Sequence, residues 1–213
     1  MPYKELKERA AKAVQILEER YPDAICSLEY IVPHELMIAT RLAAQCTDAR
    51  VNTVTPELFA KYPSVEAFAE ANVEDIEKII YPCGFYRTKA ADIIAACQML
   101  RDEYHSRLPD NLEDLLRLPG IGRKTANLLL GDIYHKPAIV CDTHCIRICG
   151  RLGLTDTKDP YKCELKLREL LEPEKSNDFC HRLVLFGRDI CSARSPKCDG
   201  CPLSHLCPSV QTK

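Results

Sequence analysis

The sequence predicts an all-α protein of about ten helices, and three observations support this. Apolar residues recur at intervals of three and four along nearly the whole chain, which is the period of an amphipathic helix. Ser, Thr, Asp or Asn precede these stretches, and Pro or Gly follow them, as at helix ends. No segment alternates convincingly as a strand does. The 213 residues are 46% hydrophobic, which suffices for one large or two small domains.

The first expected helix runs from Tyr3 to Arg20, with Leu6, Ala10, Val14 and neighbouring apolar residues on one face. It ends before a Pro-Asp pair. Five further helices are expected in the first half of the chain: from Pro33 to about Gln45, from Thr47 or Asp48 to Lys61, from Ser64 through Phe68, from Asn72 through Ile80, and from Phe85 to about Tyr104.

The second half continues the helical pattern. The expected helices are a short one capped by Asp110 or Asn111, one that follows a turn at 118–122, one from Thr143 onward, one capped by Asp159 that runs from Pro160 to about Leu171, and one from Ser176 or Asn177 to Ile190. The remaining residues are rich in Cys, Pro and Gly. Pro196, Gly200, Pro202 and Pro208 are expected to exclude both helix and strand there.

The turn between two of these helices is the most informative stretch. It reads Leu118-Pro119-Gly120-Ile121-Gly122, and its glycines are expected to permit positive φ and a close approach of another backbone. The helix that follows presents free N–H groups and a positive dipole end, which suit a phosphate. The turn lacks the spacing of a nucleotide-binding P-loop. It therefore predicts a helix-turn-helix unit that grips a nucleic-acid backbone through residues 118–122 and Arg123.

Lys124 and Asp142 form a candidate catalytic pair. Lys124 lies in the first turn of a helix, where the dipole opposes its charge, and burial would lower the pKa of its amine further. Asp142, 18 residues later, is expected at a helix N-cap, where backbone N–H groups keep a carboxylate ionised. The simpler interpretations are a solvated lysine and an ordinary cap.

Charge and targeting signals exclude some protein classes. The net charge of −2 does not indicate binding to nucleic acid by bulk charge, although basic residues locally outnumber acidic ones between Asn111 and Gly153. No run of 18 apolar residues occurs, so no membrane span is expected. The N-terminal residues resemble neither a secretion signal nor a transit peptide, which favours the cytoplasm.

Thirteen cysteines in a chain without a secretion signal favour reduced, buried or metal-bound thiols over disulfides. Cys191, Cys198, Cys201 and Cys207 form the pattern C-x6-C-x2-C-x5-C. Zinc usually takes two C-x2-C pairs, and only one is present, so a four-cysteine iron–sulfur cluster fits better; zinc and unbound thiols are the alternatives. The other nine cysteines are expected to fill core space, including Cys141, Cys145 and Cys149, whose linear stripe cannot surround one metal ion.

These motifs occur together in the order and spacing of a known family. The hairpin Leu118–Ala126, the Lys124–Asp142 interval and the C-terminal cysteines resemble endonuclease III, the iron–sulfur, helix-hairpin-helix DNA glycosylase family. The likeness covers nearly the whole chain. Ala43–Asp48 resembles the segment before the family's second barrel helix, and Gly84–Ala90 resembles its wedge loop.

The resemblance implies two helical domains with a DNA-binding cleft between them. One is a six-helix bundle of residues 26–135 that contains the hairpin. The other joins residues 1–25 to 136–213 and carries a [4Fe-4S] cluster on the four C-terminal cysteines. By the same likeness, Lys124 is the nucleophile and Asp142 its carboxylate partner.

The resemblance also implies DNA contacts. Gln45 and Phe85 match positions that enter the duplex where the damaged base has left; Phe85 stands where the family often has Leu, and its apolar bulk should serve as a wedge. Arg194 and Lys197 would touch phosphates, or belong to an ordinary solvated loop. His144 either contacts DNA or shapes the turn next to Asp142.

The implied activity is that of a bifunctional DNA glycosylase and AP lyase. Its expected partner is double-stranded DNA with an oxidised or saturated pyrimidine or an abasic site. The expected enzyme is a monomer in a prokaryotic cytoplasm, associated with the nucleoid through DNA and not with a membrane. The competing hypotheses are a mismatch or adenine glycosylase of the same fold, whose members lack the lysine, and a non-catalytic DNA-binding module with a structural metal.

Overall fold

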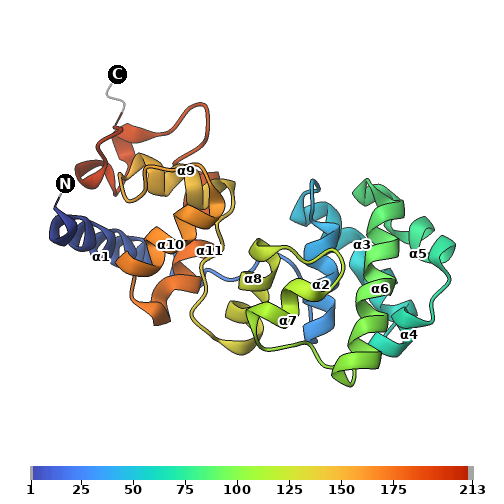
Figure 1. Ribbon diagram of the computed structural model, residues 1–213. Helices are drawn as coiled ribbons and strands as arrows, with labels where there is room; N and C mark the ends of the chain where they lie inside the picture. The colour runs from blue at the N-terminus through green and yellow to red at the C-terminus, as the bar shows by residue number, and fades with distance from the viewer. Residues whose placement is uncertain (1, 211–213) are drawn as a thin grey trace. The chain divides into compact units, whose positions relative to one another are not determined.

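The computed structural model describes residues 2–210, and the described part of the chain is helical throughout, with no β-strand (Figure 1). Within it lie eleven α-helices and four short 3₁₀ helices. The all-α fold predicted from the sequence is therefore confirmed. None of the helices formed by these residues has the length and apolar character needed to cross a membrane.

The chain forms two compact units. One comprises Cys26–Tyr134, and the other joins the segment ending at Ile25 to the segment starting at His135. The helices of the Cys26–Tyr134 unit are α2 (Pro33–Leu42), α3 (Asp48–Lys61), α4 (Val65–Ala69), α5 (Val73–Ile80), α6 (Tyr86–Tyr104), α7 (Leu112–Arg117) and α8 (Arg123–Tyr134), with the 3₁₀ helix η1 (Tyr81–Cys83). The other unit holds α1 (Tyr3–Arg20), α9 (Thr143–Arg151), α10 (Pro160–Leu170) and α11 (Ser176–Asp189), with the 3₁₀ helices η2 (Pro173–Lys175), η3 (Cys198–Gly200) and η4 (Ser204–Leu206).

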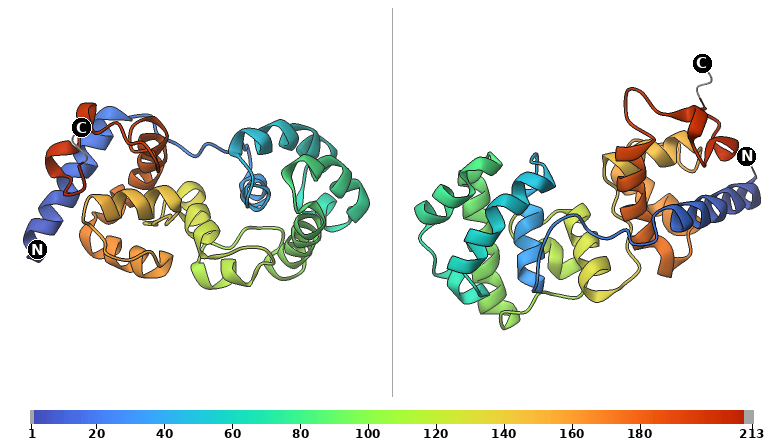
Figure 2. Two further views of the ribbon diagram at one scale, coloured as in Figure 1. Left: turned by 90° about the horizontal axis from the view of Figure 1, so that it is seen from above. Right: turned by 180° about the vertical axis from the view of Figure 1, so that it is seen from behind.

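Capping side chains set the starts of the helices in the Cys26–Tyr134 unit. Thr47, Ser64, Asn72 and Asn111 each accept a backbone N–H from the first turn of the helix that follows. These caps satisfy N–H groups that have no partner inside the helix. The longest helix of the unit, α6, packs against α4 and α5, and α8 packs against α2 and α7 (Figures 1 and 2).

In the other unit, α1 packs on α10 and α11, and α11 packs on α9. The buried stripe of α1 consists of Ala10, Ala13, Val14 and Leu17. Arg9 donates to the carbonyl of Leu152 over 3.0 Å, which links the N-terminal helix to the segment after α9. This contact and the shared core explain why the two ends of the chain fold as one unit.

Two local expectations differ from the structure. Helix α2 ends at Leu42 rather than near Gln45, because Gln45 adopts a left-handed backbone with φ of 54°. The C-terminal segment contains η3 and η4, although its prolines and glycine were expected to exclude helix. A single 3₁₀ turn needs only one or two backbone hydrogen bonds, so such residues do not prevent it.

Candidate functional site

The predicted hairpin is present as α7, the turn 118–122 and α8. The side chains of Leu118 and Ile121 are buried, so these residues can meet a phosphate only through their backbone. Gly120 and Gly122 are exposed. The hairpin is thus anchored by its apolar side chains and presents its backbone to solvent.

The two glycines of the turn have different roles. Gly120 has φ of +75°, and a Cβ there would lie 2.8 Å from Arg41 and 2.9 Å from Asp92. Arg41 and Asp92 form a partly buried ion pair between α2 and α6, with Nε 2.7 Å from Oδ2. Gly122 does not have a positive φ, contrary to expectation, and no atom lies within 4 Å of the position of its missing Cβ. Gly120 therefore docks the turn, and Gly122 leaves open space at the N-terminus of α8.

Lys124 lies in the first turn of α8, as predicted from the sequence. Its side chain is exposed, so the burial expected for it does not occur. Lys124 does lie near the positive end of the helix dipole, as expected, and it is two residues from Gly122, where no atom occupies the space of a Cβ. The hairpin therefore exposes a primary amine in the first turn of its second helix, next to the turn 118–122.

Asp142 is the N-cap of α9, and its Oδ1 accepts the backbone N–H of Cys145 over 2.7 Å. This bond satisfies an N–H group that has no partner inside the helix and fixes the carboxylate at the start of α9. The side chain is half-buried. Asp142 belongs to the unit that starts at His135, whereas Lys124 belongs to the Cys26–Tyr134 unit.

Gln45 and Phe85 share an unusual backbone geometry. Both have left-handed φ angles, 54° and 47°, and both side chains are exposed, that of Phe85 to 66%. Left-handed backbone is uncommon for a residue with a Cβ and is retained only where surrounding structure enforces it. Phe85 is therefore not a core residue, and both side chains are held outward at the ends of short loops.

A buried lysine links these two loops. Lys89, on α6, is fully buried, and its Nζ donates to the carbonyl of Leu42 over 2.8 Å and to that of Cys83 over 2.9 Å. Burial lowers the pKa of this amine. Leu42 ends α2, three residues before Gln45, and Cys83 lies two residues before Phe85. Sequence reasoning missed Lys89; its only signal was a lysine at a position of α6 where the helical period calls for an apolar residue.

His144 packs inside its own unit. Its Nδ1 lies 3.1 Å from Arg147 Nη2, and a Cβ at Gly187 would lie 2.2 Å from the same Nδ1. Gly187 thus permits α11 to approach α9 closely. Both roles considered for His144, a contact to DNA and the shaping of the turn next to Asp142, stay predictions.

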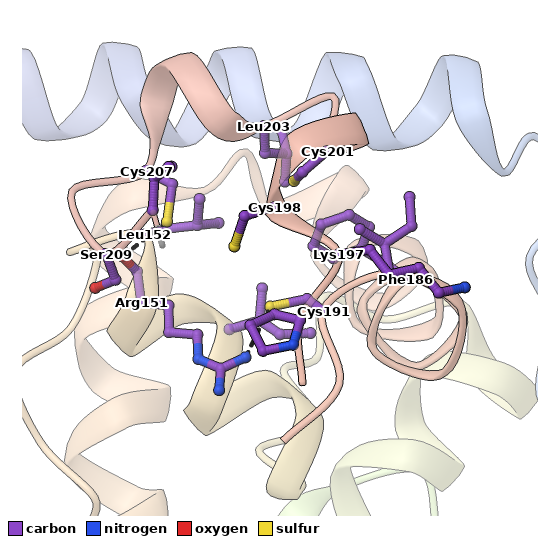
Figure 3. Close-up of a pocket in the computed structure, with 14 residues that line it drawn as sticks. Arg151, Leu152, Phe186, Cys191, Lys197, Cys198, Cys201, Leu203, Cys207 and Ser209 are labelled. Carbon is purple, nitrogen blue, oxygen red and sulfur yellow. Dashed lines mark hydrogen bonds between the residues drawn. The ribbon is translucent and has the colours of Figure 1, made fainter. Parts of the chain in front are cut away.

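The four C-terminal cysteines line one pocket (Figure 3). Arg151, the last residue of α9, and Leu152, which follows it, line the same pocket. Arg151 Nη1 donates to Cys191 Sγ over 3.2 Å and to the carbonyl of Ser192 over 2.7 Å. Arg147 donates to the carbonyl of Cys191 over 3.1 Å. Neither of these two arginines was singled out from the sequence. Their spacing of four residues places both on one face of α9, and this was the available signal that they act together.

The spacing of these sulfurs discriminates between the metals considered. A single zinc ion with Zn–S bonds of about 2.3 Å would hold its four sulfurs about 3.8 Å apart. Within residues 2–210, the only three cysteines whose sulfurs all lie within 4.8 Å of one another are Cys141, Cys145 and Cys163. No three of the C-terminal cysteines meet that distance, so their pocket suits a larger group than one ion.

The phosphate contacts expected for the cysteine loop remain a prediction. Arg194 and Lys197 are exposed, and Lys197 lies 3.9 Å from Asp189 in a solvated ion pair. Such a pair is weak enough to open for a phosphate. Seven of the nine remaining cysteines are buried, as predicted for core residues, whereas Cys26 and Cys46 are only half-buried.

Comparison with known proteins agrees with this geometry. Residues 38–173 match the family described as HhH-GPD superfamily base excision DNA repair protein, and residues 191–207 match the iron–sulfur binding domain of endonuclease III. The chain is 44% identical to endonuclease III of Synechocystis sp. over 96% of its own length and 94% of that protein.

Two solved structures are similar over most of the chain. A non-covalent endonuclease III–DNA complex gives a TM-score of 0.90 at 39% identity and covers 95% of each chain. A trapped endonuclease III–DNA covalent intermediate, an estranged-adenine complex, also gives a TM-score of 0.90 at 39% identity, and the match covers 95% of this chain and 96% of that one.

Proposed function

The chain belongs to the endonuclease III family of base excision DNA repair proteins, and we propose that Lys124 and Asp142 carry its reaction. It is a bifunctional DNA glycosylase and AP lyase with an iron–sulfur cluster as its cofactor. The observation that carries the proposal is the exposed Lys124 amine beside Gly122, at the end of a hairpin anchored by buried side chains.

The substrate is double-stranded DNA that contains an oxidised or saturated pyrimidine, or an abasic site. The target base must leave the stack before its glycosidic bond can be reached. Gln45 and Phe85, held outward by their left-handed backbones, fill the space that the base vacates. The exposed backbone of Gly120 and Gly122, with Arg123, contacts a phosphate; Leu118 and Ile121 hold the turn in place.

The reaction begins with cleavage of the glycosidic bond. The ionised carboxylate of Asp142 stabilises positive charge on the sugar as the base departs with the bonding electron pair and is protonated. The amine nitrogen of Lys124 attacks C1′ and gives up its proton, and transfer of a proton to O4′ opens the sugar ring and converts the adduct to an imine. At a pre-formed abasic site, the amine condenses with the C1′ aldehyde and loses water to give the same imine. Removal of a C2′ proton then expels the 3′ phosphate by β-elimination, which cuts the strand. Hydrolysis of the imine frees Lys124.

Cys191, Cys198, Cys201 and Cys207 are the ligands of a [4Fe-4S] cluster. The pocket they line and their wide spacing fit this group, and Arg151 supplies a cation at Cys191 Sγ that offsets thiolate charge. When bound, the cluster supplies structural cross-links to a segment with little regular structure. The loop between the first two ligands then presents Arg194 and Lys197 to phosphates.

One chain contains both the amine and the carboxylate, so the enzyme works as a monomer. Its place is the bacterial cytoplasm, in contact with the nucleoid through DNA. A sedimentation measurement at micromolar concentration should give the mass of one chain, and a stable dimer would contradict this part of the proposal.

Borohydride trapping tests the proposed nucleophile. The protein is mixed with a duplex that carries one thymine glycol, and borohydride reduces the imine to a stable amine. Wild-type protein should give a covalent adduct, and Lys124→Gln should give none while it still binds the duplex. Lys162→Gln, which changes an exposed lysine of α10, is the matched control and should trap as wild type does.

Two results would contradict the proposal in different ways. An adduct in Lys124→Gln would show that another amine is the nucleophile. Binding of the damaged duplex by the wild type without any adduct or strand cleavage would favour the non-catalytic DNA-binding module.

A further inference from the structure

A second group of cysteines lies apart in sequence from the iron–sulfur ligands. Cys141 precedes α9, Cys145 lies on α9 and Cys163 lies on α10, and their three sulfurs all lie within 4.8 Å of one another. All three side chains are buried, and those of Cys145 and Cys163 are fully so. Thiols from three chain segments therefore converge on one point inside the unit.

Two more thiols border this group. Cys149 lies one helical turn after Cys145 on α9 and is fully buried. Cys180, on α11, accepts the backbone N–H of Val140 at its sulfur over 3.3 Å. Because Val140 is adjacent to Cys141 in the chain, this bond holds the Cys180 sulfur beside the group.

The linear stripe of Cys141, Cys145 and Cys149 cannot surround one ion, as argued from the sequence. Cys163 changes this, because it adds a ligand from α10 whose sulfur lies within 4.8 Å of those of Cys141 and Cys145. Three sulfurs around a zinc ion at about 2.3 Å would lie about 4 Å apart, so the observed spacing needs only small side-chain rotations.

We propose that Cys141, Cys145 and Cys163 bind one thiophilic d¹⁰ cation of the zinc class, and that the side chain of Cys180, whose sulfur lies outside the 4.8 Å group in this structure, turns toward them as the fourth ligand. Each ligating thiol loses its proton to solvent, so binding of one Zn²⁺ by four thiols releases four protons and leaves a net charge of −2 at the site. Cys145 lies in the first turn of α9, which begins at Thr143, and the helix dipole there favours this negative charge. The Thr155 hydroxyl, 4.0 Å from Cys163 Sγ, can donate to that sulfur once it is deprotonated.

The ion would join α9, α10 and α11 at one point. Cys141 is adjacent to Asp142, and Cys145 donates the N–H that Asp142 accepts. The site therefore holds the N-terminus of α9, and with it the carboxylate, without any ligand entering the reaction. This role is distinct from that of the iron–sulfur cluster, which holds the segment after Cys191.

The experiment uses the full chain with its iron–sulfur cluster. The protein is equilibrated with ZnCl₂, passed through a column with a weak chelator, and analysed for zinc and iron. One zinc per chain should remain without loss of iron. X-ray absorption at the zinc edge, which the iron does not disturb, should show only sulfur neighbours at about 2.3 Å.

Variants assign the site. Cys163→Ser should lower retained zinc at least tenfold, whereas Cys97→Ser, an equally buried cysteine on α6 of the other unit, should retain zinc as the wild type does. If Cys163→Ser does not fold, the ligands are identified instead by alkylation of the wild-type protein in mild denaturant, with and without zinc. Zinc should then protect Cys141, Cys145 and Cys163 from alkylation, as mapped by mass spectrometry, and a strong chelator should remove the protection.

Several results would overturn the proposal. These are zinc retention equal in Cys163→Ser and wild type, nitrogen or oxygen neighbours of the zinc, and zinc uptake matched by loss of iron. Recovery of Cys141 and Cys145 as a disulfide in protein that binds no zinc would assign the group to thiol oxidation instead.

Discussion

Cys145 connects the proposed catalytic carboxylate to the buried thiols, because its backbone N–H donates to Asp142 Oδ1 over 2.7 Å while its sulfur lies within 4.8 Å of those of Cys141 and Cys163. The other end of the same helix carries Arg151, which contacts Cys191 of the iron–sulfur loop. Helix α9 thus holds Asp142 at its start and the cluster loop at its end, and both depend on the packing of one element.

Asp142→Asn should separate the catalytic role of this residue from its capping role. Asn caps helices as well as Asp does, so stability should change by less than about 1 kcal/mol. The negative charge is lost, so single-turnover base release should fall at least a hundredfold. Asp159→Asn is the matched control, since Asp159 caps α10 through the N–H of Lys162 over 2.8 Å. Equal rates for both variants on a damaged duplex would refute the assignment.

Phe85→Ala should weaken binding of a damaged duplex about tenfold, which corresponds to about 1.4 kcal/mol. Because the side chain is 66% exposed, stability should change by no more than about 0.5 kcal/mol. Gln45→Ala should act in the same direction. Ile31→Ala removes an apolar side chain of the same unit that is even more exposed, at 91%, and should leave affinity unchanged. Fluorescence anisotropy with damaged and undamaged duplexes measures the effect, and no difference between Phe85→Ala and Ile31→Ala would contradict the wedge role.

Lys89→Met should loosen both loops that carry these residues. Met matches the length of Lys but leaves the carbonyls of Leu42 and Cys83 without a donor, at a cost of about 1–3 kcal/mol that relief of the buried charge partly offsets. Amide hydrogen exchange should accelerate at residues 43–46 and 83–86 while the rest of the unit stays protected. Unchanged exchange in both loops would show that Lys89 does not hold them.

Gly120→Ala and Gly122→Ala should affect different properties, the first stability and the second DNA affinity. A Cβ at Gly120 requires a strained φ and meets Arg41 and Asp92, so the variant should lose about 1–3 kcal/mol in the free energy of unfolding. A Cβ at Gly122 meets no protein atom, so stability should be retained while DNA affinity falls, because the methyl group occupies the space proposed for a phosphate. Denaturant unfolding and anisotropy test the pair. Full DNA affinity in Gly122→Ala would place the phosphate elsewhere.

Cys198→Ser should abolish the brown visible absorption of the purified protein, because one ligand of the cluster is lost. Limited proteolysis should then cut within residues 191–207, whose regular structure is confined to η3 and η4. Cys97→Ser, at a buried position on α6, should stay brown and resistant. A colourless wild type prepared without oxygen, with one zinc in place of iron, would contradict the ligand assignment.

The sequence by itself determined the helices, because caps and prolines act locally. Thr47, Ser64, Asn72, Asn111 and Asp159 each cap the helix expected of them. It also determined the hairpin, the C-terminal cysteine pattern and the N-cap position of Asp142, since each depends on spacing along a short segment. These features were sufficient to indicate the family.

Only the tertiary structure decided what depends on residues distant in sequence. Lys124 is exposed rather than buried. Gly120 alone of the two hairpin glycines has a positive φ, and Arg41 of α2 and Asp92 of α6 lie against it. Lys89 reaches two loops whose carbonyls lie 47 and 6 residues away. Cys163 joins Cys141 and Cys145 through the packing of α10. Periodicity specifies which face of a helix is buried, but it does not specify which other segment covers that face. The contacts of Lys89, Gly120 and Cys163 depend on which segment that is, so only the tertiary structure shows them.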